Sequence, residues 1–248
     1  MKKLIISSIL VALLAGCSQT PYQAKIHPHW GYSGETDPQH WGELSVDYQL
    51  CERGKNQSPV NFTKAVTSYN SVKYQYQPSH ISLVNNGHTL QASLQTENNQ
   101  LKIDEKVFVL QQFHFHSPSE HQFQGNHFPV EIHFVHKSAT GELAVLAVMV
   151  KEGNANPVLE ELLHNPLNIN EKKVLARPLD IIKLLPQSKG HYRLNGSLTT
   201  PPCSEGVNWV VLQQPINASS EQLQLFSRTL GHNNRPVQPM NARIVVSE

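Results

Sequence analysis

The sequence is poor in charge and in cysteine. Only 16% of its 248 residues are charged, and 20 basic residues nearly balance 19 acidic ones. A chain without an excess of one sign lacks the electrostatic footprint that attracts nucleic acids, so we expect no nucleic-acid partner. There are only three cysteines, and no internal repeat or low-complexity tract is present. These absences exclude repeat architectures and leave a chain long enough for one sizeable core.

The sequence also lacks a hydrophobic run that could cross a bilayer. The apolar stretch at residues 4–14 follows two lysines and is too short, because a membrane-spanning helix needs ~20 residues. A short apolar stretch behind basic residues is typical of a targeting segment. The next residues, Leu-Ala-Gly-Cys at 14–17, resemble the cleavage box of bacterial lipoproteins, in which Cys17 becomes the lipidated first residue. A plain secretory signal is the alternative.

This segment divides the chain into three parts. We expect a lipoprotein signal peptide at residues 1–16, a lipidated tether at residues 17–28 and one folded domain at residues 29–248. The tether is polar, contains two prolines and shows no periodicity. We therefore predict an exported, periplasmic protein whose membrane contact is the lipid at Cys17 alone. Because Ser18 is not the acidic residue that tends to retain lipoproteins at the inner membrane, the outer membrane is favoured.

The cysteine count agrees with export. One lipidated cysteine leaves Cys51 and Cys203 as an even pair in an oxidising compartment. We expect a disulfide between them, and two free buried thiols are the alternative.

Most of the regular patterns in the chain indicate strands. Short alternating or apolar runs occur at residues 81–84, 89–94, 107–116, 130–136, 143–150 and 207–212. Two helices are also predicted. One spans residues 157–164, with Asn156 as N-cap and proline at the first helical position. Another begins after Ser219, which has capping-box spacing to Gln222. The sequence alone therefore predicts a β-dominated α+β domain with short peripheral helices.

Two of these strands carry the most informative residues. His114 and His116 alternate with aromatic residues in the run Gln-Gln-Phe-His-Phe-His at 111–116, and His133 lies in the run Glu-Ile-His-Phe-Val-His at 131–136. Residues i and i+2 of a strand point to the same face, so the first two histidines can reach one ion together. A neighbouring antiparallel strand adds the third. Three neutral imidazoles with the fourth tetrahedral position open are the layout of a catalytic zinc site.

An isolated pair of histidines on a strand is more often exposed or incidentally buried than bound to metal. Two further residues favour the metal here. Metal-bound imidazoles usually donate their second N–H to an acceptor, and Gln112 and Glu131 each lie two residues before a proposed ligand, on the same strand face. We therefore predict that His114, His116 and His133 bind Zn²⁺, and that Gln112 and Glu131 support them.

The chain carries further motifs in a fixed order. They are His-Trp-Gly-Tyr at 29–32, Gln-Ser-Pro-Val at 57–60, Asn-Asn-Gly-His at 85–88, Ser-Glu-His at 119–121, Gly-Ser-Leu-Thr-Thr-Pro-Pro at 196–202 and Asn-Arg-Pro at 234–236. Together with the two histidine runs, they resemble the α-class carbonic anhydrases from about residue 29 to about residue 245. A chance match to one motif is common, but a chance match to all of them in order is not.

The resemblance implies a single domain with a large central twisted sheet, mixed but mostly antiparallel, and a metal at the bottom of a conical cleft. It also implies reversible hydration of carbon dioxide to bicarbonate and a proton, by attack of a zinc-bound hydroxide. The partner is then a small-molecule substrate, carbon dioxide or bicarbonate. Exported relatives carry a disulfide at positions matching Cys51 and Cys203. A homodimer stays open.

The resemblance also implies roles for single residues. Thr199 accepts the proton of the hydroxide and donates its own to Glu120, and because an ionised carboxylate only accepts, this chain of hydrogen bonds has one polarity. His88 matches the proton shuttle of the family at the cleft mouth, and histidine suits proton transfer near neutrality. The residues that match the intervening water network are Tyr32, Asn86 and Gln91.

Carbon dioxide has no net charge or dipole, so it needs an apolar wall beside the hydroxide. The residues that match this wall are Val135, Val145, Leu198, Val207 and Trp209, and Thr200 matches a polar contact for bicarbonate. Taken alone, each apolar residue is better explained as core. The chain departs from many relatives at Leu194, where an aromatic residue is usual, and at Asn234, where animal enzymes have tryptophan. We expect these departures to affect stability or fine tuning, and not the reaction type.

Two other functions are the alternatives to an enzyme. A binding module without catalysis arises in this family by loss of zinc ligands, but all three histidines are present here together with Thr199, Glu120 and His88. A periplasmic zinc store needs exposed and exchangeable metal, which an enclosed site with one open position does not provide.

Overall fold

The computed structural model describes residues 28–69, 71–164 and 166–248 of the chain. The predicted signal peptide, and the tether with Cys17 apart from residue 28, lie outside these ranges. Within the ranges, no helix combines the length and the apolar character that a membrane crossing requires.

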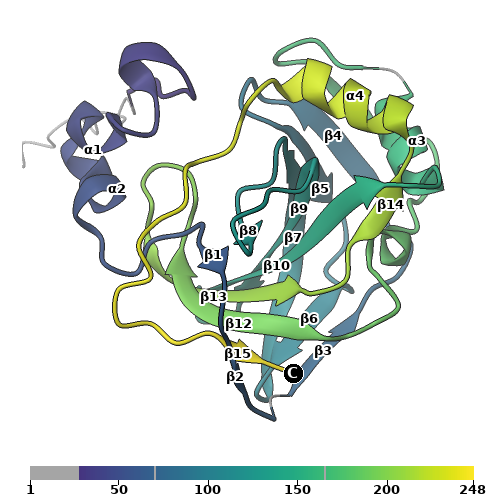
Figure 1. The fold of residues 1–248 in the computed structure, drawn as a ribbon. Coiled ribbons are helices and arrows are strands. Elements are labelled where there is room, and N and C mark those ends of the chain that lie inside the picture. Colours follow the sequence, from purple (N-terminus) through teal and green to yellow (C-terminus); the bar gives the residue numbers. More distant parts are fainter. Residues whose placement is uncertain (1–27, 70, 165) are drawn as a thin grey trace, which may run out of the picture.

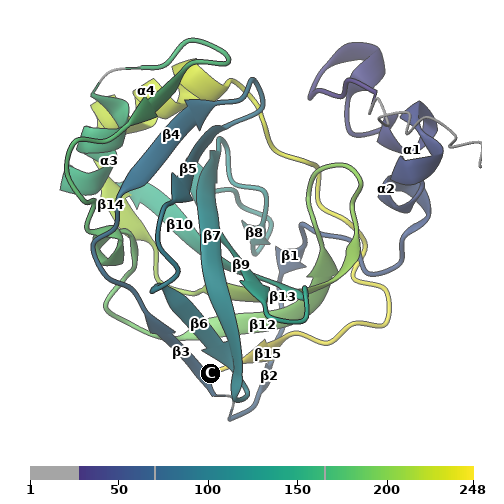
Figure 2. The ribbon, with the colours of Figure 1, turned by 180° about the vertical axis from the view of Figure 1, so that it is seen from behind.

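One large sheet organises the described part of the chain, and Figures 1 and 2 show its twist from opposite sides. Its main path, in spatial order, is β11 (Lys172–Val174), β4 (Ile81–Asn85), β5 (Leu90–Leu94), β7 (Lys106–His116), β9 (Val130–Ser138), β10 (Leu143–Glu152), β13 (Glu205–Leu212), β12 (His191–Ser197), β15 (Val246–Ser247) and β2 (Val66–Thr67). The strands β3 (Val72–Gln75), β6 (Gln100–Ile103) and β14 (Ile216–Ala218) pair beside this path, and β1 (Asn61–Phe62) pairs with β8 (Gln122–Phe123) in a separate ribbon.

The predicted sheet type is confirmed. Most neighbouring strands are antiparallel, whereas β10 pairs in parallel with β13 and β14, and β15 pairs in parallel with β2. Every predicted strand is present, with ends that differ from the prediction by at most two residues. The helices are short and peripheral (Figure 1). They are α1 (Trp41–Leu44), α2 (Leu50–Arg53), α3 (Pro157–Leu163) and α4 (Ser220–Leu230), with 3₁₀ turns η1 (Gly34–Thr36), η2 (Val46–Tyr48) and η3 (Ile181–Leu184).

Strand alternation divides the core into two layers. On β9, Ile132 and Phe134 belong to the larger apolar cluster, which α3 and α4 cover with Leu159 and Phe226. The intervening residues of β9 face the other side of the sheet, because successive side chains of a strand point to opposite faces. A second apolar cluster, which includes Trp209, lies on that side. The functional site is built on this second face.

The two longer helices begin as predicted. The Asn156 side chain caps α3 by accepting hydrogen bonds from the backbone N–H groups of Val158 and Leu159. The capping box of α4 is complete, because Ser219 accepts from the Gln222 N–H and the Gln222 side chain accepts from the Ser219 N–H. These caps satisfy N–H groups that a helix start otherwise leaves unpaired.

A β-bulge in β7 breaks the strict alternation that the sequence suggests. Leu110 pairs with His136 and Gln112 pairs with Val135, so Gln111 is an extra residue. Leu110 therefore lies on the face of the larger apolar cluster. After the bulge, the even-numbered residues of β7 point to the opposite face. As a result Gln112 and the histidines that follow it turn to the second face.

Candidate metal centre and catalytic cleft

The pairing of β7 with β9 brings the three predicted ligands together. His114 is the direct partner of His133, and His116 is the partner of Glu131 on the same ladder. One ring nitrogen from each of the three histidines lies within 4.8 Å of the other two. His116 and His133 are buried, whereas His114 is partly open to the cleft.

The second nitrogen of each ring is held by an acceptor. These hydrogen bonds are His114 Nδ1 to Gln112 Oε1 at 2.8 Å, His116 Nδ1 to the Asn233 carbonyl at 2.8 Å and His133 Nε2 to Glu131 Oε1 at 2.7 Å. A carbonyl oxygen accepts only, so the Nδ1 of His116 carries the proton and its Nε2 presents a lone pair. That Nε2 is buried and has no hydrogen-bond partner. A metal ion bound by the three histidines would supply the missing interaction.

The electrostatics favour neutral imidazoles. Burial lowers the pKa of His116, and it lowers the pKa of His114 well below its ordinary value. Burial by itself raises the pKa of Glu131, but His121 and His133 outweigh it and hold that pKa well below its usual range. Three imidazoles, two of them with a pKa lowered by burial and the third backed by a buried carboxylate, are a donor set that fits Zn²⁺.

Glu120 lies against these ligands. Its side chain is fully buried, and its Oε1 accepts the Arg235 backbone N–H at 2.8 Å. Its Oε2 lies 3.5 Å from His116 Nε2 and 3.9 Å from His133 Nδ1, and it has no hydrogen-bond partner. The bond from Thr199 that the resemblance implies is therefore not formed to this oxygen. Thr199 itself is buried and lines the same cleft.

The segment that carries Thr199 is held by hydrogen bonds and close packing between residues 196–197, Ser58 and Trp209. Ser197 and Ser58 exchange hydrogen bonds between N–H and hydroxyl groups at 2.9 and 3.2 Å, and the Trp209 indole N–H donates to the Ser197 carbonyl at 3.0 Å. A Cβ atom at Gly196 overlaps the Ser58 hydroxyl, so only glycine allows this approach. The glycine of the motif at 196–202 is explained by that contact.

The cleft has an apolar side. A cavity of about 300 Å³ runs from His114 and His133 along an apolar wall. The predicted residues that line it are Val135, Val145, Leu198, Thr199, Thr200 and Trp209. Val207 is buried in the same apolar cluster but does not line the cavity, whereas Leu143, which was not predicted, does.

The other side of the cleft is polar. A cavity of about 130 Å³ shares His114 and Thr200 with the first one and extends to His88. The three residues predicted for the water network, Tyr32, Asn86 and Gln91, all line it. The ring of His88 stacks on Trp30 with 3.8 Å between centroids. Burial lowers the pKa of His88, and the nearby His29 lowers it further.

The predicted disulfide is confirmed. Cys51 on α2 is bonded to Cys203, just beyond the Thr199 segment. The buried guanidinium of Arg235 donates to the Cys51 carbonyl at 2.7 Å and to the Ser58 carbonyl at 2.8 Å. Burial lowers the pKa of Arg235 to about 10, so the group stays charged at neutral pH. Neither Arg235 nor Asn233 was predicted as a site residue, although Arg235 lies within the motif at 234–236.

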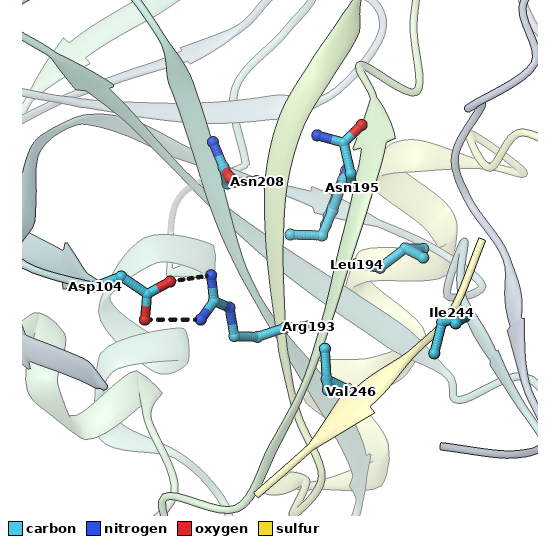
Figure 3. A pocket seen from close by; sticks show the side chains of 8 residues that line it. Asp104, Arg193, Leu194, Asn195, Asn208, Ile244 and Val246 are labelled. Atoms are coloured by element: carbon cyan, nitrogen blue, oxygen red, sulfur yellow. Dashed lines mark hydrogen bonds and ion pairs between the residues drawn. The ribbon is translucent and has the colours of Figure 1, made fainter. Parts of the chain in front are cut away.

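Another concavity, of about 270 Å³, lies away from the histidines (Figure 3). Its guanidinium, from Arg193, is paired with both carboxylate oxygens of Asp104 at 3.1 and 2.8 Å. The remaining lining residues are amides, aliphatic side chains and Trp209. Of the described residues that line this concavity, only Asp104 and Arg193 are charged, and they neutralise each other. The cleft with the histidines is therefore the candidate catalytic site.

Three imidazoles that can hold one metal ion, beside a cleft with one apolar and one polar side, are the arrangement of a metalloenzyme site. The model of the eukaryotic-type carbonic anhydrase family matches residues 36–248. The chain belongs to this family, and its enzyme activity is that of a carbonic anhydrase, the hydration of carbon dioxide.

Bacterial relatives resemble the chain over nearly its whole length. A carbonic anhydrase of Pectobacterium atrosepticum is 45% identical over 240 residues, which cover 96% of this chain and 97% of the relative. The α-carbonic anhydrase of Thermovibrio ammonificans, solved in complex with the inhibitor sulfanilamide, has a TM-score of 0.86 and 46% identity over 88% of this chain and 99% of its own. The α-carbonic anhydrase of Photobacterium profundum has a TM-score of 0.84 and 42% identity, with 88% and 100% covered.

Proposed function

We propose that the chain hydrates carbon dioxide reversibly to bicarbonate and a proton with one Zn²⁺ bound by His114, His116 and His133. The observation that carries the proposal is the buried, unpartnered Nε2 of His116 beside the free nitrogens of the other two rings. Bound there, zinc lowers the pKa of water to ~7, the established value for carbonic anhydrases, and so supplies hydroxide for attack on carbon dioxide at neutral pH. Gln112 and Glu131 hold two of the three rings in the required tautomers.

Thr199 and Glu120 are proposed to orient the nucleophile. The free Oε2 of Glu120 is an acceptor without a donor, and Thr199 lines the cleft at the same centre. If the Thr199 hydroxyl donates to this carboxylate, its oxygen must accept from a donor in the cleft. In that arrangement Thr199 would direct a nucleophile in the cleft toward the apolar wall, which would receive carbon dioxide.

The two sides of the cleft are proposed to serve substrate and proton separately. The apolar wall, with Val135, Val145 and Trp209, suits an uncharged linear molecule, and Thr200 at its edge suits bicarbonate. His88 on the polar side is proposed to export the proton, through water ordered by Tyr32 and Gln91. Its half-buried ring and lowered pKa favour release of a proton to solvent near neutral pH.

The location of the protein is also a proposal. We propose an exported, periplasmic enzyme with a signal peptide at residues 1–16, a lipid at Cys17, a tether to residue 28 and a catalytic domain at 29–248, at the outer membrane more than the inner. The disulfide supports an oxidising compartment. A homodimer stays a prediction.

The metal assignment is tested by His133→Ala, with the exposed His80→Ala as matched control. We expect His133→Ala to lose bound zinc and carbon dioxide hydration together, by more than the 10–100-fold that changes around a metal ligand cause. Zinc content is measured by mass spectrometry, and hydration is measured with and without sulfanilamide. Full zinc content in His133→Ala would falsify the ligand set, whereas zinc without hydration in the unaltered protein indicates a binding module.

A further inference from the structure

Asn233 lies in a segment without regular structure, yet its side chain is almost completely buried. Its Nδ2 donates to the carbonyl of His88 and to the carbonyl of Phe115, both at 2.9 Å. Its Oδ1 accepts the Ser117 N–H at 2.7 Å. A carboxamide offers donors on one atom and acceptors on the other, so no other side chain of this size can make the same three bonds.

The backbone of Asn233 holds the metal ligand. Its carbonyl accepts the proton of His116 Nδ1 at 2.8 Å, and its N–H donates to the Ser117 carbonyl at 3.2 Å. Two residues further on, the Arg235 N–H donates to Glu120. One short segment therefore contacts a zinc ligand, the carboxylate beside it and the backbone at His88.

The turn that presents His88 is anchored at its far end by Thr89. The Thr89 hydroxyl donates to the Phe115 carbonyl at 2.6 Å and accepts the Phe115 N–H at 3.1 Å. Asn86 closes the turn by accepting from the N–H groups of His88 and Thr89 at 2.9 and 2.8 Å, but Asn86 itself is exposed. Gly87, at φ 84°, gives the turn its left-handed step. The Asn233 amide adds a bond to the carbonyl of His88 itself, and the same nitrogen donates to Phe115 on the strand that carries His116.

We propose that the side chain of Asn233 is a positioning residue for proton export, because it fixes the backbone at His88 relative to the zinc ligand His116. This inference rests on the proposed role of His88 as proton shuttle. A shift of His88 lengthens the water path between the metal site and the imidazole. The backbone bond to His116 does not depend on the side chain, so a side-chain change separates proton export from metal binding.

The test compares Asn233→Ala and Asn233→Asp in the zinc-loaded enzyme. Aspartate keeps the size and the acceptor for Ser117 but removes both N–H donors. We expect either variant to lower turnover in weak buffer about tenfold, which is less than the ~100-fold that misplacement of a reacting group can cause, because the His88 side chain itself is retained. Oxygen-isotope exchange between carbon dioxide and bicarbonate at equilibrium requires no proton export, so it should stay within about twofold. Imidazole buffer should restore turnover, and zinc content should be unchanged.

Asn99→Ala is the matched control for a structural effect. Asn99 is also a fully buried asparagine, which accepts the Gln77 N–H and donates to the Ser79 hydroxyl, both at 2.7 Å. We expect Asn99→Ala to lower the melting temperature without changing the ratio of turnover to exchange. In a His88→Ala background, Asn233→Ala should add no further loss of turnover, because residues that act through one another are not additive.

Three results would overturn the inference. The first is that turnover and isotope exchange fall by the same factor in the Asn233 variants. The second is that Asn99→Ala changes the ratio of turnover to exchange as much as Asn233→Ala does. The third is that Asn233→Ala lowers turnover by the same factor in the His88→Ala background as in the unaltered protein. If His88→Ala alone leaves weak-buffer turnover unchanged, the shuttle itself is wrong. A normal effect of His88→Ala with none from Asn233→Ala rejects only the role of Asn233.

Discussion

The proposed role of Thr199 rests on Glu120, because the buried Oε2 of Glu120 has no hydrogen-bond donor. We expect Thr199→Ala to keep stoichiometric zinc, since all three imidazoles remain. Carbon dioxide hydration should fall about 100-fold, the order of loss caused by misorienting a reacting group. Stopped-flow hydration assays and zinc analysis of the same sample check both expectations.

The control for this variant is Thr63→Ala, because Thr63 is an exposed threonine outside the cleft. It should leave hydration and zinc unchanged. An unaltered hydration rate in Thr199→Ala means that Thr199 serves only the turn in which it lies.

Single residues differ in how far the sequence reveals them. His114, His116 and His133 are predictable, because alternation on two strands puts them on one face without knowledge of the rest of the fold. Asn233 acts through its backbone carbonyl and through side-chain bonds to residues that lie 116 to 145 positions earlier in the sequence. No local pattern marks such a residue, because its partners are defined by tertiary packing alone.

At the scale of elements, Asn156 at the start of α3 links this helix to η3 and α4 by hydrogen bonds. Asn156 caps the helix, its Nδ2 donates to the Lys183 carbonyl at 3.1 Å in η3, and its N–H donates to Gln222 at the start of α4. We expect Asn156→Ala to lower the free energy of unfolding by about 1–2 kcal/mol, the upper range for loss of an N-cap. Urea unfolding measures this loss, and activity per bound zinc should not change.

Asn168→Ala serves as control, since the Asn168 side chain is exposed and its hydrogen bonds are to Glu171. Its effect should stay within about 0.5 kcal/mol, as is usual for surface substitutions. If both variants lose the same free energy of unfolding, the hydrogen bonds of Asn156 do not stabilise the contact between α3, η3 and α4.

The positions of the helices and strands were largely predictable from the sequence, but the face of the sheet to which each residue of β7 points was not. The strands were found because their alternating and apolar runs are long, and the caps of α3 and α4 were found because their residues are local. The bulge at Gln111 could not be found, because it exists only in the register between β7 and β9. Strict alternation along β7 puts Leu110 and His114 on one face, whereas the bulge separates them.

At the scale of the whole molecule, the disulfide closes a separation of 152 residues between α2 and the end of the Thr199 segment. We expect the Cys51→Ser/Cys203→Ser double variant to unfold about 2–4 kcal/mol more easily, the typical range for loss of a native disulfide. Chemical unfolding of the oxidised, reduced and double-variant proteins checks this. The oxidised protein should be two hydrogens lighter by non-reducing mass analysis, and freely alkylated thiols in the exported enzyme contradict the pairing in the cell.

Acid should destabilise the fold through His136. Burial lowers the pKa of His136 from 6.5 to about 3, and its Nε2 lies 2.7 Å from the Tyr76 hydroxyl. Below pH 6.5 the unfolded chain binds a proton at this residue that the folded chain does not, so the free energy of unfolding falls as the pH drops, until about pH 3. Urea unfolding across this range should give a shallower pH dependence for His136→Gln than for the unaltered protein. Parallel curves reject the assignment.

The bond from Asn233 to His116 spans 117 residues of sequence. A ribosome adds residues in order, so both metal-binding strands are complete long before the acceptor for His116 has been made. Until then Nδ1 of that ring has no fixed partner, and nothing selects the tautomer that presents Nε2. The acceptor for His116 is thus a late product of biosynthesis. A chain interrupted between the two strands and Asn233 carries all three ligands, with Gln112 and Glu131 beside two of them, but lacks the group that orients the third.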